Sequence, residues 1–224
     1  MASPNYDVLS IAHSKNIGDT VAAAATNGAR WTSAQRDNHL NEAIRRLLRL
    51  CAEQAIAKMN AGRSAVGEIA FFDPYILEEA KSLTNNVLVL SSWTGTATWI
   101  LSAYNSTDSV PIKRLSEAIR IWVLTGGNSF LTASATNQYW IRDAGNFRLV
   151  DGATNSTDSI TLRFVKAHAA LSAGGSADIL LSSSYWDWVT DIGYVVAFEE
   201  APNELNDAKA MQKKAAVLEQ IKAL

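Results

Sequence analysis

One segment restricts the fold of this chain more than any other, the stretch from Thr32 to Asn60. Its apolar residues recur at steps of three and four, which is the spacing of one face of an α-helix. Thr32 and Gln35 have the spacing of a capping box at its start, and Gly62 is a plausible stop signal. The apolar residues of this stripe are Leu40, Ile44, Leu47, Leu48, Cys51, Ala55, Ile56 and Met59.

The pattern predicts a single helix of about 44 Å, at about 1.5 Å per residue. A helix of this length more often frames a bundle or an assembly than a compact catalytic core. Cys51 lies on the apolar stripe, so we interpret it as buried packing and not as a nucleophile.

Beyond residue 63 the helical period gives way to short segments rich in β-branched and aromatic residues, separated by turn-forming residues. Asp73 and Pro74 resemble a cap and a first-turn proline, which predicts a short helix through about Leu83. The clearest hairpin is YWIRDAGNFRLV, with its turn at residues 144–146. The predicted strands are VLVLS at 87, ATWILSAY at 97, VPIKRL at 110, AIRIWVL at 118, SFLTAS at 129, NQYWIRD at 137, NFRLV at 146 and SITLRFV at 159.

The helical period returns from about residue 177. A helix is predicted over 185–201, and Pro202 separates it from a last, alanine-rich helix. The apolar stripe of that last helix is narrow, so we expect it to dock against something else, such as another subunit. The fold class predicted is α+β: a helical bundle, built from the long N-terminal helix and the C-terminal helices, with an inserted antiparallel β lobe. Residues 1–62 and 167–224 would form the bundle, and residues 63–166 the mainly β lobe.

The pentapeptide NSTDS occurs twice, at 105–109 and at 155–159. Each copy matches the acceptor pattern for N-glycosylation, but no export signal precedes it. Asn, Ser, Thr and Asp bond readily to nearby backbone, so we interpret both copies as unmodified turns in exposed loops at strand ends. An internal duplication is the alternative.

Charge and composition narrow the function classes. Twenty basic and twenty-two acidic residues give a net charge of −2, so no global field attracts free nucleic acid. The single cysteine excludes an intramolecular disulfide and a cysteine-based metal site. With neither a signal peptide nor an apolar membrane span, we expect a soluble protein that is not exported.

The residues that could perform chemistry do not form a recognisable site. His13, His39 and His168 are isolated in the sequence, and no HExxH pair is present. We interpret His39, which falls within the long helix, as a surface or interface residue. A calcium site at Asp108 and Asp158 was considered, but their spacing matches no loop that wraps the ion. We therefore predict no catalytic residue, no cofactor and no metal, and a protein that is not an enzyme.

Arginines on the long helix suggest a surface of another kind. Together with Arg36, the residues Arg45, Arg46 and Arg49 could face a nucleic acid or an acidic patch on a partner. The alternative is an ordinary solvated helix face.

Three segments resemble one known family. They are RWTSAQRDNHLNEAIRRLL at 30–48, GNFRLVDGATNSTDSITLRFVKAHAALS at 145–172 and the predicted helix at 185–201. In these segments the chain resembles the head-to-tail adaptor, connector or neck, proteins of tailed bacteriophages, particularly the larger type of the short-tailed phages.

The resemblance implies a structural protein of the virion neck, made in the cytoplasm of the host bacterium. It implies a homo-oligomeric ring, of twelve subunits in relatives, beneath the portal protein and above a tail or nozzle protein. Double-stranded DNA would be a ligand only as the genome that passes through at ejection, and no membrane would be involved. The predicted subunit or portal interface is Met211, Ala215, Leu218, Ile221 and Leu224, and the predicted channel or partner face is Arg45, Arg46 and Arg49.

Two other functions remain as alternatives. In a carbohydrate- or receptor-binding module, Trp93, Trp99, Trp122 and Trp140 of the β region would form stacking platforms. In an enzyme, His168 and scattered aspartates would form the site.

Overall fold

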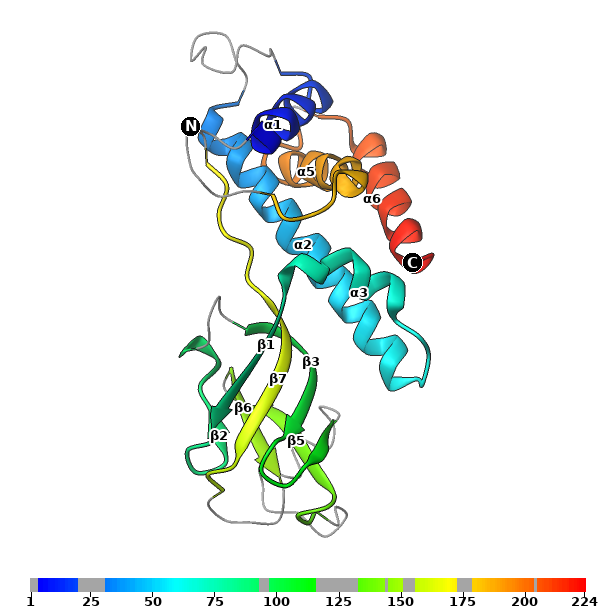
Figure 1. Cartoon of the computed structure of the whole chain (residues 1–224). Coiled ribbons are helices and arrows are strands. Elements are labelled where there is room, and N and C mark those ends of the chain that lie inside the picture. The colour runs from blue at the N-terminus through cyan, green and yellow to red at the C-terminus, as the bar shows by residue number, and fades with distance from the viewer. Residues whose placement is uncertain are drawn as a thin grey trace. The chain divides into compact units, whose positions relative to one another are not determined.

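A computed structural model of the chain describes residues 4–19, 31–92, 97–115, 133–143, 145–150, 156–172, 179–203 and 205–224. The chain divides into two compact units, which are considered separately. One comprises Met1–Tyr75 with His168–Leu224, and the other Ile76–Ala167. The first is helical and the second is built of strands (Figure 1).

The helical unit is organised around α2, Ser33–Asn60, which packs against the other four helices described in this unit. The predicted start of α2 is confirmed: Gln35 N donates to Thr32 Oγ1 at 3.2 Å, and Thr32 N donates to Gln35 Oε1 at 3.0 Å. Gly62, at φ +68°, follows its C-terminus. The other helices are α1 (Pro4–Asn16), α3 (Val66–Phe72), α5 (Trp186–Glu200) and α6 (Asp207–Lys222), with 3₁₀ turns at Asp73–Tyr75 and Ser183–Tyr185.

Burial along α2 follows the predicted stripe. Leu40, Ile44, Leu47 and Cys51 have no exposed surface. Burial raises the pKa of the Cys51 thiol well above its usual value, so this side chain stays a neutral packing group, as predicted.

The short helix predicted from Asp73 to Leu83 is wrong. Helix α3 ends at Phe72, just before this segment, and Ile76–Ser82 form strand β1. Strand β1 pairs with β7 along its whole length, from Ile76 opposite Val165 to Ser82 opposite Ser159. This pairing overrides the helix preference of Glu78, Glu79 and Ala80.

The β unit is a seven-stranded mixed sheet in the order β1-β7-β3-β4-β5-β6-β2. The two end strands, β1 and β2, are separated in the chain only by residues 83–86, and two residues of that turn, Asn85 and Asn86, have positive φ angles. So short a connection brings the ends of the sheet together, and the sheet forms a nearly closed barrel. The remaining strands are β2 (Val87–Leu88), β3 (Ala97–Asn105), β4 (Val110–Arg114), β5 (Gln138–Asp143), β6 (Asn146–Val150) and β7 (Ser159–Lys166).

The barrel encloses its own core. Side chains that alternate along β3, β5, β6 and β7 point inward, including Trp140, Phe147, Leu162 and Phe164, each less than 5% exposed. Trp140 stacks on Phe147 with ring centroids 5.3 Å apart. Because β5 and β6 lie on either side of a turn with Gly145 at φ +83°, the predicted hairpin is confirmed.

The predicted fold class, a helical bundle with an inserted antiparallel β lobe, is wrong. The chain is an α+β protein in which strands dominate the core, as a nearly closed mixed barrel. Strands β4 and β5 are parallel, with Ile112 opposite Gln138, which an antiparallel lobe excludes. The first segment of the helical unit extends to Tyr75, beyond the predicted boundary at residue 62, because α3 packs on α2. The strand predicted at 118 and most of the one at 129 lie outside the described residues.

The two NSTDS copies contact each other at one end of the barrel. Asn105 Nδ2 donates to Asp158 Oδ2 at 2.8 Å and to Gln138 Oε1 at 2.9 Å. Ser159 N donates to Thr107 Oγ1 at 2.9 Å. The first copy is a turn, since Thr107 N donates to Asn105 Oδ1 at 2.9 Å. The prediction of exposed loops is confirmed for residues 106–109 of the first copy, but it is wrong for Asn105 and for Ser156 of the second copy, which are buried.

The Asn105 side chain therefore ties three strands together, and its loss should weaken the barrel. Asn105→Ala removes the hydrogen bonds that Gln138 Oε1 and Asp158 Oδ2 accept from Asn105 Nδ2, and we expect a loss of about 2 kcal/mol in the free energy of unfolding. This loss is measured by urea unfolding, with hydrogen exchange at residues 76–167 as the probe of the barrel. The control is Ser106→Ala, at an exposed neighbour that bonds only Thr161, where a change within about 0.5 kcal/mol is expected. Equal losses in the two variants would contradict this account.

Candidate functional site

The predicted interface on α6 divides between two sides of the helix. Met211 is 63% exposed and Ala215 is exposed, whereas Ile221 is 3% exposed and belongs to the core of the helical unit. Leu218 and Leu224 are half-buried. The side that α6 buries is formed instead by Ala210, Val217 and Ile221.

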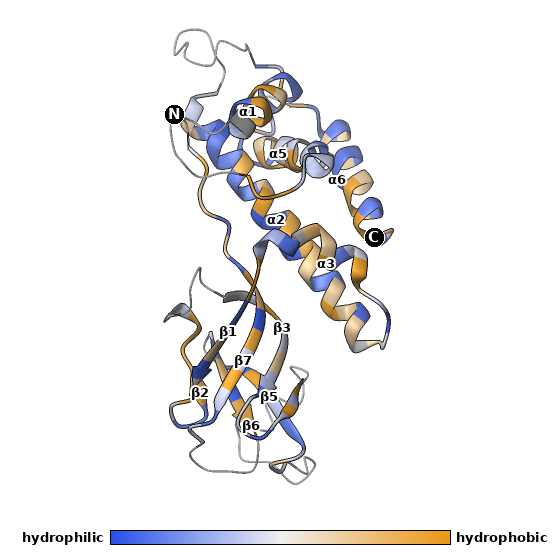
Figure 2. Ribbon diagram, viewed as in Figure 1, coloured by the Kyte–Doolittle hydropathy of each residue, from blue (hydrophilic) through white to orange (hydrophobic). Residues whose placement is uncertain are grey.

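Met211, Ala215 and Leu218 follow one another at steps of four and three, so they form one continuous apolar line on α6, here called the α6 stripe. Helix α6 as a whole carries both hydrophilic and hydrophobic residues, as its mixed colours show (Figure 2). At the end of α6, the carbonyl of Leu224 lies so close to Gly67 that a Cβ there would be 2.1 Å from it. The neighbouring Val66 is 73% exposed. The end of α6 therefore lies against the start of α3.

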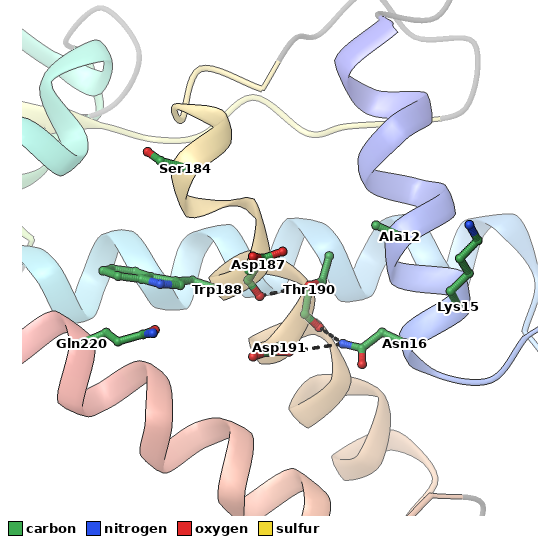
Figure 3. Close-up of a pocket in the computed structure, with 9 residues that line it drawn as sticks. All are labelled: Ala12, Lys15, Asn16, Ser184, Asp187, Trp188, Thr190, Asp191 and Gln220. Carbon is green, nitrogen blue, oxygen red and sulfur yellow. Dashed lines mark hydrogen bonds between the residues drawn. The ribbon is translucent and has the colours of Figure 1, made fainter.

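A groove of about 720 Å³ lies between α1, α5 and α6 (Figure 3). Asp187 and Asp191 line it, one helical turn apart on α5. Asp191 forms an ion pair with Lys213 and accepts a hydrogen bond from Asn16 Nδ2 at 3.4 Å. Asp187 is exposed, and no other described residue forms an ion pair with it. The full lining is Ala12, Lys15, Asn16, Ser184, Asp187, Trp188, Thr190, Asp191 and Gln220.

The arginines proposed as a channel or partner face all lie on α2 and form ion pairs within the helical unit. Arg45 pairs with Glu42 at 3.5 Å and Arg49 with Glu53 at 2.8 Å, along the exposed side of the helix. Arg46 joins α2 to α5 through Glu199 at 2.8 Å, and this bond raises the pKa of the Arg46 guanidinium. Only Arg45 and Arg49, at 53% and 67% side-chain exposure, face solvent freely.

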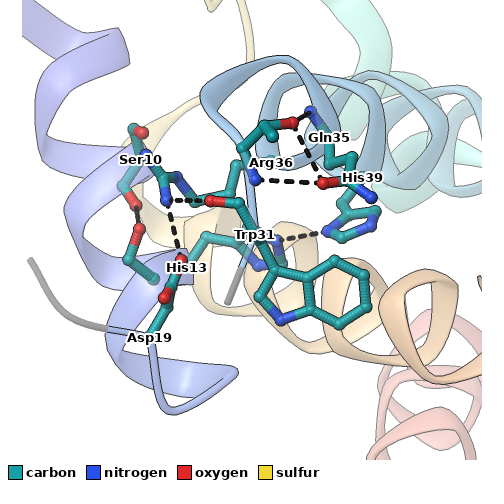
Figure 4. A network of polar contacts seen from close by, with 9 residues as sticks. Ser10, His13, Asp19, Trp31, Gln35, Arg36 and His39 are labelled. Atoms are coloured by element: carbon teal, nitrogen blue, oxygen red, sulfur yellow. Dashed lines mark hydrogen bonds and ion pairs between the residues drawn. The ribbon is translucent and has the colours of Figure 1, made fainter. Parts of the chain in front are cut away.

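A buried chain of hydrogen bonds connects α1, α2 and α5 (Figure 4). His13 Nε2 lies 3.3 Å from His39 Nδ1, and His39 Nε2 lies 2.8 Å from Glu200 Oε2. A carboxylate only accepts, so His39 donates from Nε2 and receives the Nε2 proton of His13 on its Nδ1. Nδ1 of His13 then has no partner, and the Trp31 ring packs edge-on against His39 at 4.9 Å.

A buried ion pair stands beside this chain. Arg36 Nη1 donates to Asp19 Oδ2 at 2.7 Å and to the carbonyl of Trp31 at 2.8 Å. The interpretation of Arg36 and His39 as surface residues is therefore wrong, since they are 6% and 0% exposed. No local sequence signal could have shown this, because the partners of His39 lie 26 and 161 residues away in the chain.

His168 is buried and serves as a packing group. Tyr75 Oη lies 3.1 Å from its Nδ1, and burial, with a smaller contribution from the nearby Arg45, lowers its pKa to about 4. Among the described residues no group of three or more His, Cys, Asp or Glu side chains could hold a metal ion. In the same part of the chain, no helix is long and apolar enough to cross a membrane.

The tryptophan platform proposed for a carbohydrate-binding module is incomplete. Trp140 is 4% exposed, in the barrel core, so no ligand can stack on it. Trp99 is half-buried, and Trp93 and Trp122 lie outside the described residues.

Comparison with known proteins adds no relative. No protein-family model matches the chain, and no curated protein matches it significantly.

The three histidines make the helical unit sensitive to acid. Burial lowers the pKa of His13 from 6.5 to about 3, and it also lowers the pKa of His39. Between pH 6.5 and about pH 3, His13 of the unfolded chain binds a proton that the folded unit does not bind. The free energy of unfolding of the helical unit therefore falls as the pH drops below about 6.5. We expect a slope of up to about 1.4 kcal/mol per pH unit for His13 alone.

Hydrogen exchange at pH 7, 6 and 5 measures this effect in each unit. The barrel, residues 76–167, contains no histidine and is the internal control. A helical unit whose opening free energy stays constant from pH 7 to pH 5 would contradict the assignment of neutral, buried imidazoles.

Proposed function

We propose that this chain is a structural virion protein of a tailed bacteriophage, a head-to-tail adaptor. In this proposal, identical subunits form a ring in the neck, beneath the portal and above a tail or nozzle protein. The ring joins the DNA-filled capsid to the tail, and the genome passes through it at ejection. The role is structural and not catalytic.

The observation that carries the proposal is the α6 stripe. Met211, at 63% exposure, is a large apolar side chain left in solvent on a helix that already buries its other side. Contiguous exposed apolar surface is typical of protein–protein contacts, and Ala215 and Leu218 continue the line from Met211 along α6. The resemblance of the segments 30–48, 145–172 and 185–201 to phage adaptors supplies the identity of the partner, the portal protein.

The arginine face is consistent with a surface past which DNA moves. Glu42 and Glu53 neutralise much of the charge of Arg45 and Arg49. Tight, salt-dependent binding of the phosphate backbone requires several uncompensated cations, and it would hinder passage.

Binding to the portal protein encoded in the same genome tests the proposal. Met211→Asp places a charge in the middle of the stripe, and we expect it to weaken portal binding about tenfold or more, measured by biolayer interferometry. Gln212→Asp is the matched control: it adds the same charge at an exposed neighbour about 100° around the helix, and it should bind like the wild type. If the wild-type chain does not bind the portal, the proposal is wrong. Equal binding by Met211→Asp and Gln212→Asp would remove the stripe from the interface.

A further inference from the structure

We propose that neighbouring copies of this chain contact each other through two different faces of the helical unit. The groove between α1, α5 and α6 on one copy receives Arg45 and Arg49 of the next copy. This inference rests on the proposed function, because it names the subunit contact of the proposed ring.

A closed ring of identical subunits needs two different and complementary surfaces on each subunit. The helical unit offers such a pair. One is concave, the groove with its aspartates on α5, and the other is convex, the exposed line of α2. These surfaces do not overlap, because the groove is lined by residues of α1, α5, α6 and the turn before α5, and by none of α2.

The groove has a carboxylate available for a cation. Asp187 is exposed at its edge and forms no ion pair with another described residue. Asp191, one turn along, binds Lys213 through Oδ1, and a carboxylate has further acceptor positions. The indole of Trp188 also lines the groove, with Phe71 stacked on it at 5.7 Å. Carboxylates beside an aromatic ring are a typical environment for a guanidinium.

The arginines of α2 can exchange their present partners. The pairs Arg45–Glu42 and Arg49–Glu53 join exposed side chains of the same helix, and pairs of this kind contribute little to stability. A contact that removes them from water and offers a second carboxylate is stronger, because the guanidinium can bond in a bidentate manner.

The spacing of the two sets of charges matches. Asp187 and Asp191 are four residues apart on α5, and Arg45 and Arg49 are four residues apart on α2. Both spacings correspond to about 6 Å along a helix axis. Two guanidiniums of one copy can therefore meet two carboxylates of the next. Two lysines lie near these carboxylates. Lys213 forms the ion pair with Asp191, and Lys15 is on α1, across the groove from Asp187 (Figure 3).

Charge reversal tests this pairing. Asp187→Arg and Arg49→Asp are made separately and together, and the oligomer is measured by sedimentation velocity with and without the portal protein. Each single variant should reduce ring formation about tenfold or more, since like charges then face each other. The double variant should form rings again, because its two faces are complementary once more, but it should not mix with the wild type.

Lys113→Asp, an exposed reversal on β4 of the barrel, outside both faces and the α6 stripe, is the control and should assemble normally. Rings from both single variants, or a double variant no better than either, would overturn the inference while leaving the proposed function intact. A wild-type chain that forms no ring even with the portal would overturn both.

Discussion

The burial of one side of α2 is the constraint on which the helical unit depends. Its apolar residues, from Leu40 to Ala55, are the surface against which α1, α3, α5 and α6 pack. Because the fold buries this side of α2, only the residues on its opposite side are accessible to solvent or to partners. The same holds for α6, whose buried Val217 and Ile221 leave Met211 outside.

Buried polar groups join the helices that apolar packing brings together. The Arg36–Asp19 pair and the His13–His39–Glu200 chain connect segments from both ends of the sequence. An unpaired charge in such a place would be expensive, so each group has a hydrogen-bond partner or stays neutral. Gly193 belongs to this arrangement, since a Cβ there would lie 3.0 Å from the His13 ring. The network selects one arrangement of α1 on α5.

Local patterns predicted much of the secondary structure and little of the tertiary structure. The capping box of Thr32 and the hairpin around Gly145 could be read from the sequence, because neighbouring residues determine them. The pairing of β1 with β7 could not, since it joins residues about eighty positions apart in the chain. For the same reason, the buried His39 resembled a surface residue. On α6, the period identified a stripe but not which side of the helix the unit would bury.

In the proposed ring, each subunit is joined to its neighbour by the groove on α5 and the arginines of α2, and to the portal by the α6 stripe. Electron cryomicroscopy of the purified protein mixed with its proposed partner, the portal protein, tests this arrangement most directly. The account predicts a closed ring of identical subunits, coaxial with the portal, in which each α5 groove contacts the α2 arginines of its neighbour. Isolated subunits, with the groove and the α6 stripe both in solvent, would contradict it.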